Sequence, residues 1–477
     1  MPILVELAHH FLPEVILAGG VMALILVGAA KSGRGFGIVD ELAVAILGLA
    51  VLAIVLSSTD DASIFDGAFM DDAFSRFMKV LALVGAMASI LMSVDYLVRA
   101  GLDKFEFPVL IVLSTLGMLL LISADNLISL YLGLELMSLG LYVLAAFARD
   151  DARSSEAGLK YFVLGALSSG MMLYGSTLLY GFAGTVSFSG IAAVVSSQAP
   201  LGVIFGLVFV MAGLAFKMSA APFHMWTPDV YQGAPTPVTA FFASAAKMAA
   251  AAVTARIVVT AFPGVTHQWR QIVVFLAIVS TVLGSFAAIG QTNIKRLMAY
   301  SSIGHMGFAL IGLAAGDEAG VRGVAIYLAI YLVMTIGAFA AILIMRVEGK
   351  PVEDISDLSG LSRTNGLTAF FLAMLMFSLA GVPPLAGFFA KYYVLLAAVN
   401  AGLYPLAVIG VLASAVAAYY YLRVVKIMYF DDPAPAFDPA PATLRATLAI
   451  STALLLGFWL YPAPVMEAAS AAAKSLF

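Results

Sequence analysis

Apolar runs long enough to cross a lipid bilayer recur along the whole chain, and only short polar stretches separate them. Fourteen runs can be marked, at residues 11–30, 39–56, 76–94, 107–123, 127–147, 159–183, 201–221, 238–258, 271–290, 296–315, 321–346, 367–399, 403–425 and 444–463. A transmembrane helix needs about 20 predominantly apolar residues. No stretch between two runs is long enough for a soluble domain. The pattern predicts an all-α integral membrane protein of about 14 transmembrane helices.

The composition agrees with this class of protein. Of the 477 residues, 62% are hydrophobic and 11% are charged, whereas a soluble domain has about 25% charged residues. The long continuous runs favour helices over a transmembrane barrel, whose strands are much shorter. The chain has no cysteine, which excludes a disulfide, a thiolate nucleophile and a cysteine-ligated iron–sulfur cluster within it.

Basic residues gather in the loops on one side of the predicted membrane domain. They are Lys31, Arg34, Arg99, Lys104, Arg149, Arg153, Lys295, Arg296, Arg346, Lys350 and Arg363. The opposite side has little beyond Arg270, Arg322 and Lys474, and its first long loop, SSTDDASIFDGAFMDD, carries only acidic charges. Short loops rich in Lys and Arg stay in the cytoplasm. We therefore expect both termini to face away from the cytoplasm, and the acidic loop to be solvated rather than to bind calcium.

A small set of ionisable residues remains inside the predicted spans. It comprises Glu135, Lys217, Lys247, Arg256, His305 and Lys391. Placing such a group at the centre of a membrane helix costs about 2.5–3.5 kcal/mol on insertion scales. Any one of them could be a structural ion pair or a side chain that extends to the membrane surface. Three lysines in three different helices instead favour a transport role.

Lysine suits proton transport for a specific reason. In water its pKa is about 10.4, so it holds its proton too firmly to pass it on. Desolvation lowers the pKa of a lysine towards neutrality, and a nearby carboxylate raises it again. A lysine whose distance to a carboxylate changes can therefore bind and release a proton. Glu135 is the obvious partner, although the sequence does not show for which lysine. Arg256 cannot act in this way, because arginine keeps its proton in proteins, and it is expected to form a fixed ion pair or an anchor.

Prolines break the predicted helices at two places. The first break contains Pro222, Pro228, Pro235 and Pro237, and the second contains Pro383 and Pro384, two turns before Lys391. Each proline removes an N–H donor, and unwound backbone is tolerated in a membrane only where protein buries it or where it lines a wet cavity. Broken helices beside ionisable residues in both halves of a chain indicate a transporter built from internal repeats. Each break alone could also be a simple proline kink.

Three further residues each have two possible roles. His224 lies in the first proline-rich break, and His305 follows Ser301 and Ser302 on one predicted helix. Either histidine could relay protons near neutral pH or could simply pack with a hydrogen bond. Lys160 lies near the basic side of its helix, where it could assist transport or anchor the helix end. No histidine pair suggests haem, and no cluster of metal ligands stands out in the sequence.

Three long motifs resemble a known family. The stretches KMSAAPFHMWTPDVYQGAPTPVTAF, TNIKRLMAYSSIGHMGF and LAGVPPLAGFFAKYYV look like the proton-conducting, antiporter-like membrane subunits of respiratory complex I, and the resemblance covers essentially the whole chain. It implies an antiporter-like fold with two inverted five-helix repeats and two discontinuous helices. The implied segments are 1–106 (N-terminal helices 1–3), 107–258 (first inverted repeat, helices 4–8), 259–430 (second inverted repeat, helices 9–13) and 431–477 (C-terminal helix 14).

The resemblance also implies roles for the buried residues. Glu135 would pair with Lys217 in a half-channel on the cytoplasmic side. Lys247, with His305 nearby, would form the central relay. Lys391 would lead from this relay towards the periplasmic side.

Lys160 and His224 match family positions that assist the first half of the path. The resemblance implies a multi-pass subunit of a proton-pumping NADH:quinone oxidoreductase in the bacterial cytoplasmic (inner) membrane, with both termini on the periplasmic side. No cofactor is expected in this chain, whereas FMN, iron–sulfur clusters and quinone are expected in partner subunits. The expected partners are sibling antiporter-like subunits, small membrane subunits and lipids, and no nucleic acid.

Three other functions stay open at this stage. The same lysines would serve in a subunit of a multi-subunit sodium/proton antiporter or of a membrane-bound hydrogenase. The chain could also be an inert scaffold that only positions a redox arm.

Overall fold

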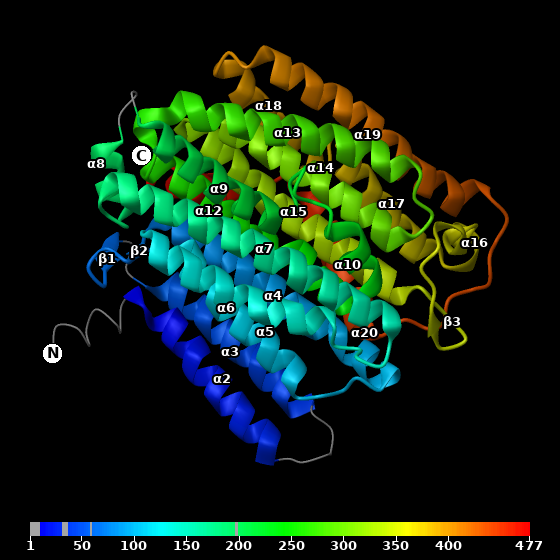
Figure 1. The fold of residues 1–477 in the computed structure, drawn as a ribbon. Coiled ribbons are helices and arrows are strands. Elements are labelled where there is room, and N and C mark those ends of the chain that lie inside the picture. The colour runs from blue at the N-terminus through cyan, green and yellow to red at the C-terminus, as the bar shows by residue number, and fades with distance from the viewer. Residues whose placement is uncertain (1–9, 31–36, 58–59, 196–198) are drawn as a thin grey trace.

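The computed structural model describes residues 10–30, 37–57, 60–195 and 199–477, which form one bundle of long helices running back and forth (Figure 1). Within these residues, eleven helices are long and apolar enough to cross a membrane, and four shorter apolar helices accompany them. Two of the shorter helices are the halves of one interrupted span. The predicted all-α fold of about 14 spans is therefore confirmed.

The N-terminal segment contributes three long helices and a small hairpin. Their bounds are α2 (Leu12–Ala30), α3 (Gly37–Leu56), β1 (Ala62–Ile64), β2 (Phe69–Asp71) and α4 (Ala73–Ala100). A reciprocal capping box fixes the start of α4. The Asp72 carboxylate accepts the Ser75 N–H at 2.7 Å, while the Asp72 N–H donates to the Ser75 hydroxyl at 2.9 Å. This pairing satisfies two donors that the start of a helix otherwise leaves free.

The segment predicted as the first repeat is a run of helices from α5 to α12. Their bounds are α5 (Glu106–Ile122), α6 (Leu127–Ala145), α7 (Ala152–Ala183), α8 (Phe188–Val194), α9 (Leu201–Met218), α10 (Thr227–Gly233), α11 (Thr236–Phe241), the π-helical turn η1 (Phe242–Ala246) and α12 (Lys247–Thr260). Asn126 and Asp151 cap α6 and α7 by accepting backbone N–H groups of the first turn. The last three elements form one continuous span, Thr236–Thr260.

The segment predicted as the second repeat runs from η2 to α19. Its elements are η2 (Pro263–Val265), α13 (Thr266–Ile289), α14 (Ile294–Ala314), α15 (Glu318–Ile344), β3 (Arg346–Val347), β4 (Lys350–Pro351), η3 (Ile355–Leu358), α16 (Leu361–Thr364), α17 (Gly366–Ala380), α18 (Ala386–Asn400) and α19 (Tyr404–Phe430). Asn293, Asp317 and Asn365 cap α14, α15 and α17 with their side chains.

Close glycine packing joins the first two helices of each repeat. A Cβ added at Gly117 of α5 would lie 2.3 Å from the Met137 backbone nitrogen on α6. A Cβ added at Gly284 of α13 would lie 2.6 Å from the Gly304 nitrogen on α14. Small residues let membrane helices approach closely and gain van der Waals contact. The same contact in both halves supports the repeat organisation.

Each repeat contains one discontinuous helix, as the prolines indicate. In the first, Ser219 follows the last residue of α9 with a left-handed backbone, φ 62°, and the helix resumes as α10. In the second, Gly381 follows the last residue of α17 with φ 88°, and the helix resumes as α18. A left-handed residue after the last turn lets its N–H satisfy carbonyls that the helix end leaves free.

Burial separates an interior group of helices from the surface of the bundle. The Thr236–Thr260 span is buried throughout its most apolar stretch, and α14 and α15 are almost entirely buried. Surface helices instead expose large apolar side chains, such as Leu26 at 70% and Leu56 at 73%. Such surfaces suit contact with lipid or with other membrane subunits. The ionisable residues of interest therefore lie mainly on helices whose packing fixes their side chains.

The two ends of the bundle differ in charge. One end, here called the basic end, holds Arg99 and Arg346, which both pair with Asp95, and Arg153 and Arg296, which lie at Asp229 and its cavity. Figure 1 shows β3 and α16 at one end of the bundle. The opposite end, the acidic end, holds the β1–β2 hairpin and lies beside α8 and the C-terminal residue. Lys31 and Arg34 fall outside the described residues.

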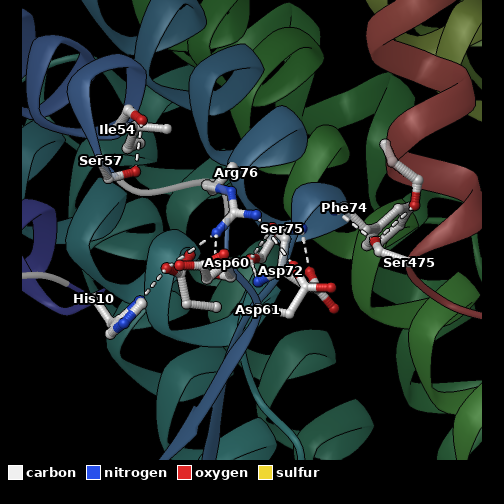
Figure 2. Close-up of polar contacts among 12 residues, drawn as sticks. His10, Ile54, Ser57, Asp60, Asp61, Asp72, Phe74, Ser75, Arg76 and Ser475 are labelled. Atoms are coloured by element: carbon white, nitrogen blue, oxygen red, sulfur yellow. Dashed lines mark hydrogen bonds and ion pairs between the residues drawn. The ribbon is translucent and has the colours of Figure 1, made fainter. Parts of the chain in front are cut away.

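The acidic loop is not simply solvated, contrary to expectation. Figure 2 shows His10 and Arg76 directed at its carboxylates. His10 Nδ1 lies 2.9 Å from Asp71 Oδ2, and Arg76 lies 3.3 Å from the same oxygen and 3.1 Å from Asp61 Oδ1. The sequence pattern does not show these partners, because His10 precedes α2 and Arg76 belongs to α4, so neither lies in the loop itself.

The C-terminal segment holds two helices rather than one, α20 (Ala442–Gly457) and α21 (Ala463–Lys474). Helix α21 packs against α4 and α15. The Ser475 hydroxyl accepts the Phe74 N–H at 3.0 Å (Figure 2), while His10 pairs with the hairpin at the same end. The first and last described residues therefore lie at the acidic end together.

Candidate functional site

Lys217 lies in the last turn of α9, directly before the first break, and its side chain is buried. Its Nζ donates to the Ser138 hydroxyl at 2.8 Å and to the Tyr142 hydroxyl at 2.9 Å, both on α6. The ring centres of Tyr142 and Phe216 lie 5.2 and 5.5 Å from Nζ. Aromatic faces at this distance attract a cation. The amine is therefore held by neutral groups.

Glu135 lies on α6, one turn before Ser138. Its side chain is half-buried, and its Oε1 has no hydrogen-bond partner among the described residues. No ion pair joins Glu135 to Lys217 within the part of the chain that the structure describes. Residues three or four positions apart are neighbours on a helix surface. A shift of the Lys217 amine by one turn along α6 would thus exchange hydroxyl partners for a carboxylate.

Lys160 and His224 lie away from the Lys217 contacts. Lys160 is at the basic end, where its Nζ lies 2.7 Å from Glu156 Oε1 and 2.7 Å from Asp229 Oδ2. His224 lies in the segment between α9 and α10, and its buried Nδ1 has no hydrogen-bond partner among the described residues. The structure brings neither side chain into hydrogen-bond contact with Lys217.

Lys247 is the first residue of α12 and follows the π-helical turn η1. Its side chain is 1% exposed, and its Nζ donates to the Ser302 hydroxyl on α14. The Ser302 hydroxyl lies 2.6 Å from the Tyr331 hydroxyl on α15, and the Tyr231 ring centre lies 5.4 Å from Nζ. Single π-helical turns inside α-helices frequently mark functional sites, because the extra residue redirects the side chains that follow.

His305 continues this cluster one turn further along α14. Its Nδ1 lies 2.5 Å from the Tyr327 hydroxyl, and its Nε2 lies 3.2 Å from the Tyr421 hydroxyl. Its ring centre is 5.2 Å from that of Tyr331. Tyr331 therefore contacts both the histidine ring and the hydroxyl that accepts from Lys247. The predicted proximity of Lys247 and His305 is present, with Tyr331 and Ser302 between them.

Lys391 lies on α18, just after the second break. Its Nζ donates to the Ala380 carbonyl at 2.8 Å and to the Ser414 hydroxyl on α19 at 2.9 Å. Ala380 is the last residue of α17, so the break itself supplies a carbonyl that a continuous helix would have used. The Phe308 ring centre lies 5.0 Å from Nζ, and Phe308 follows His305 by one turn. Lys391 also borders a largely apolar cavity of about 570 Å³.

Aromatic rings separate the three lysines. From Lys217 to Lys247 the ring contacts run through Tyr142, Tyr161, Trp226 and Tyr231, with centre-to-centre distances of 4.9, 4.3 and 6.3 Å. The ring of Phe308, one turn after His305 on α14, contacts the Lys391 amine. Proton movement between these groups therefore needs water molecules beside the rings as well as the hydrogen bonds described above.

Arg256 forms the fixed ion pair that the sequence indicates. Its Nη1 and Nη2 each donate to a carboxylate oxygen of Asp72 at 2.8 Å, and its Nε donates to the Ile122 carbonyl at 3.1 Å. Burial raises the pKa of Asp72, but Arg256 and Ser75 outweigh burial and hold this pKa below its ordinary value. Burial raises the pKa of Asp125 to about 6, while Arg256 lowers it and Asp72 adds to the increase.

Sequence reasoning missed several polar partners and one ion pair. The missed partners are Ser138, Tyr142, Tyr231, Tyr327, Tyr331, Ser414 and Tyr421. Ser138 and Tyr142 follow Glu135 at helical spacing, which could have indicated them. A buried ion pair joins Glu14 and Lys79, with Oε1 and Nζ 2.8 Å apart. Both residues lie inside predicted spans and belonged among the buried charges.

Two successive runs of helices, each with a broken helix beside a buried lysine, fit an antiporter-like membrane protein. A family model described as NADH:quinone oxidoreductase/Mrp antiporter, TM, matches residues 124–417. NADH-quinone oxidoreductase subunit N of Beijerinckia indica subsp. indica is 67% identical over 476 residues, which cover 100% of each chain. The chain belongs to this antiporter family and, within it, to the family of NADH-quinone oxidoreductase subunit N.

Solved structures agree with this assignment. A chain of respiratory complex I from Thermus thermophilus with bound aureothin is 35% identical, with a TM-score of 0.83, and the match covers 96% of this chain and 99% of that one. A chain of the Mrp complex from Dietzia sp. DQ12-45-1b is 21% identical, with a TM-score of 0.87 and 97% coverage of both chains. The second likeness shows a shared fold. Among the described residues, no group of three or more His, Cys, Asp or Glu side chains is placed to hold a metal.

Proposed function

We propose that this chain is a proton-translocating subunit of an NADH:quinone oxidoreductase, in which quinone reduction by partner subunits drives protons through it. The observation that carries the proposal is the state of Lys217, Lys247 and Lys391. All three are buried, and their amines donate to hydroxyl or carbonyl oxygens rather than to carboxylates. A lysine without a fixed counter-ion loses its proton more easily than a paired lysine, which a relay requires.

The basic end faces the cytoplasm in this proposal, because loops rich in Lys and Arg remain there. Both described ends of the chain then lie on the periplasmic side. Protons reach Lys217 through the first repeat, pass to Lys247 and His305, and leave by way of Lys391. The contact from Lys247 through Ser302 to Tyr331, beside His305, supports the central step.

Glu135 controls the proton affinity of Lys217 in this scheme. When the amine stays with Ser138 and Tyr142, no carboxylate holds its proton. When it moves to the Glu135 carboxylate, the ammonium form is favoured and a proton is taken up. Lys160, at the cytoplasmic mouth, and His224, in the break, assist delivery to this pair.

The energy for transport comes from partner subunits. Moving one charge against 100 mV costs about 2.3 kcal/mol. We assign FMN, the iron–sulfur clusters and the quinone site to partner subunits, since the chain has no cysteine to ligate a cluster. Sibling antiporter-like subunits and small membrane subunits complete the membrane part.

Replacement of Lys217 by alanine in the intact complex, reconstituted in liposomes, tests the proposal. The variant should assemble and lose most of its quinone-coupled proton pumping, because no other group at this position can carry the proton. Lys426→Ala is the matched control, because Lys426 is 61% exposed and pairs with Asp431 near the end of α19. Normal pumping by Lys217→Ala would contradict the scheme.

A sodium/proton antiporter subunit is the second candidate, and the fold shared with a chain of the Mrp complex favours it. Purification of the native complex separates the two, because flavin and iron–sulfur subunits accompany the first and small antiporter subunits the second. A nickel-bearing partner would instead indicate a hydrogenase. An inert scaffold would keep pumping after joint neutralisation of Lys217, Lys247 and Lys391.

A further inference from the structure

The short helix α10 is held by side chains from two other helices. It has seven residues, between the first break and the Thr236–Thr260 span. A helix of this length is not stable by itself, because forming its first turn costs more than its few hydrogen bonds return. Its position therefore depends on tertiary contacts.

Asp229, the only carboxylate of α10, joins the two repeats. Its Oδ2 lies 2.7 Å from Lys160 Nζ on α7, in the first repeat. Its Oδ1 lies 2.8 Å from Arg296 Nη1 on α14, in the second repeat. The same Nη1 lies 3.2 Å from Gln232 Oε1, also on α10. One carboxylate thus connects α10 to a helix of each half.

The residue before Arg296 holds the end of α10. Lys295 Nζ donates to the Ala234 carbonyl at 3.1 Å, directly after α10, and lies 2.8 Å from Glu353 Oε1. Lys295 and Arg296 begin α14, and the same helix carries Ser302, the partner of Lys247. The first turn of α14 therefore holds α10, while Ser302, further along α14, contacts Lys247.

A polar cavity opens where α10 meets α7. Its volume is about 210 Å³, and its lining consists of Arg153, Glu156, Ala157, Lys160, Asp229, Gln232 and Gly233. A water molecule occupies about 30 Å³ in the liquid, so the cavity has room for several. At Gly233 an added Cβ would lie 2.5 Å from the Arg153 carbonyl, so α10 lies directly against α7 at this wall. A movement of α10 would change how far water reaches inward from the basic end.

We propose that Asp229 is a positioning residue that latches α10 to both repeats and thereby limits water access to the lysine path from the basic end. This inference rests on the proposed function and adds a control point to it. The contacts of Asp229 suit a latch. Lys160 and Asp229 are each 40% exposed and Arg296 is 27% exposed, and ion pairs with this exposure break and re-form readily. When Arg296 leaves Asp229, α10 loses one of its links to α14, and water from the basic end gains access to the lysine path.

Three variants in the intact complex, reconstituted in liposomes, test the latch. Asp229→Asn and Arg296→Gln should each raise the passive proton flux of the resting complex about threefold or more and lower the protons moved per electron. Quinone reduction should continue, since neither residue belongs to the redox chemistry. The double variant, Asp229→Asn with Arg296→Gln, should leak no more protons and pump no fewer protons per electron than either single variant. Asp229→Glu, which keeps the carboxylate, should restore coupling.

Glu156→Gln is the matched control. Glu156 lines the same cavity and pairs with Lys160, but it lies on α7 with Lys160 and does not contact α14. If the Asp229→Asn complex shows the same passive proton flux and the same number of protons moved per electron as the Glu156→Gln complex, the latch is overturned. A loss of assembled complex with normal coupling in the remainder would also overturn it, because that result is what a purely structural ion pair gives.

A labelling measurement reports the position of α10 without any reference to pumping. The chain has no cysteine, so Ala157→Cys provides the one thiol of this subunit, on the cavity wall, where the native residue is 2% exposed. Label on this subunit is read after the subunits of the complex are separated. A membrane-impermeant maleimide should label it faster when Asp229→Asn is also present. Faster labelling in a complex whose Lys217→Ala variant pumps normally would reject the proposed function but keep the latch. Equal labelling rates would reject the latch alone.

Discussion

The Nζ atom of Lys217 lies 2.8 Å from the hydroxyl of Ser138, which follows Glu135 by one helical turn on α6. The amine therefore contacts an uncharged hydroxyl, one helical turn away from the Glu135 carboxylate. Both positions lie on one face of one helix, so a change of partner needs rotation of the long lysine side chain and no unfolding of either helix. In the proposed function, this arrangement would give the Glu135–Lys217 pair two states, of which the structure shows the one without an ion pair.

Ser138→Ala should weaken the hold on the Lys217 amine at its present place, because it removes the hydroxyl that accepts from this amine. A hydrogen bond between uncharged groups contributes about 0.5–1.5 kcal/mol net, and Tyr142 can retain only part of it. We expect quinone-coupled proton pumping to fall by up to about tenfold, with assembly unchanged. Proton uptake by the reconstituted complex measures the effect. Ser176→Ala is the control, because the Ser176 hydroxyl donates to the Met172 carbonyl and contacts no lysine. Equal pumping by both variants would contradict a role for Ser138.

The buried Arg256–Asp72 pair predicts an effect on assembly. Removing one member of a buried ion pair costs about 3–5 kcal/mol, because the other charge is left without a partner. Arg256→Gln should therefore reduce the amount of this subunit in purified complexes. The double variant with Asp72→Asn should recover part of the loss, since no unpaired charge remains. Quantitative mass spectrometry of the complex measures both. If the double variant loses as much subunit from the complex as the two single variants lose together, the unpaired charge is not the cause of the loss.

The acidity of Asp72 limits the conditions for this test. Its pKa is held below the ordinary value, so its contribution to stability is complete at neutral pH and is lost only as the pH falls through the lowered pKa. Between pH 6 and 8 the ion pair should therefore contribute a constant amount, to within about 1 kcal/mol. Differences in the amount of assembled subunit that are measured between pH 6 and 8 therefore report the substitution, since Asp72 does not titrate in this range.

The sequence predicts the membrane fold because its signals are local. The cost of a charge or of unwound backbone in a membrane is large, so Lys247, Lys391 and the two proline-rich breaks stand out in one chain. The π-helical turn η1 was not predicted, since it results from one extra residue in the helical hydrogen-bond pattern. Helix α21 was missed because its twelve residues, largely small alanines, do not reach spanning length.

The partners of the buried lysines depend on tertiary packing and could not be predicted. The Lys217 amine donates to the Tyr142 hydroxyl on α6, and the Lys391 amine donates to the Ser414 hydroxyl on α19. Nothing in the local sequence of a lysine specifies which distant hydroxyl will reach it. The sequence could narrow the choice only on the helix of a known candidate, as for Ser138 beside Glu135.

Asp125 gives the prediction with the clearest dependence on pH. It lies between α5 and α6, and burial, as the main cause, raises its pKa to about 6, against the ordinary value of 3.8. The folded protein therefore binds this proton more tightly than the unfolded chain does. The resulting stabilisation is complete below about pH 4 and is lost as the pH rises through about 6. At pH 7.5 the ionised carboxylate thus destabilises the fold, by at most about 3 kcal/mol.

Asp125→Asn should consequently stabilise the subunit at pH 7.5, because asparagine needs no proton to be neutral. The gain should shrink as the pH falls to 5, where the native carboxyl is itself largely protonated. The temperature at which the subunit is lost from the detergent-solubilised complex measures this difference at both values. Asp66→Asn is the control, since Asp66 is an exposed residue of the β1–β2 hairpin, and it should give no gain at either pH. A gain for Asp125→Asn of the same size at pH 5 and pH 7.5 would mean that the substitution acts through packing, and that the buried carboxyl is not the source of the instability.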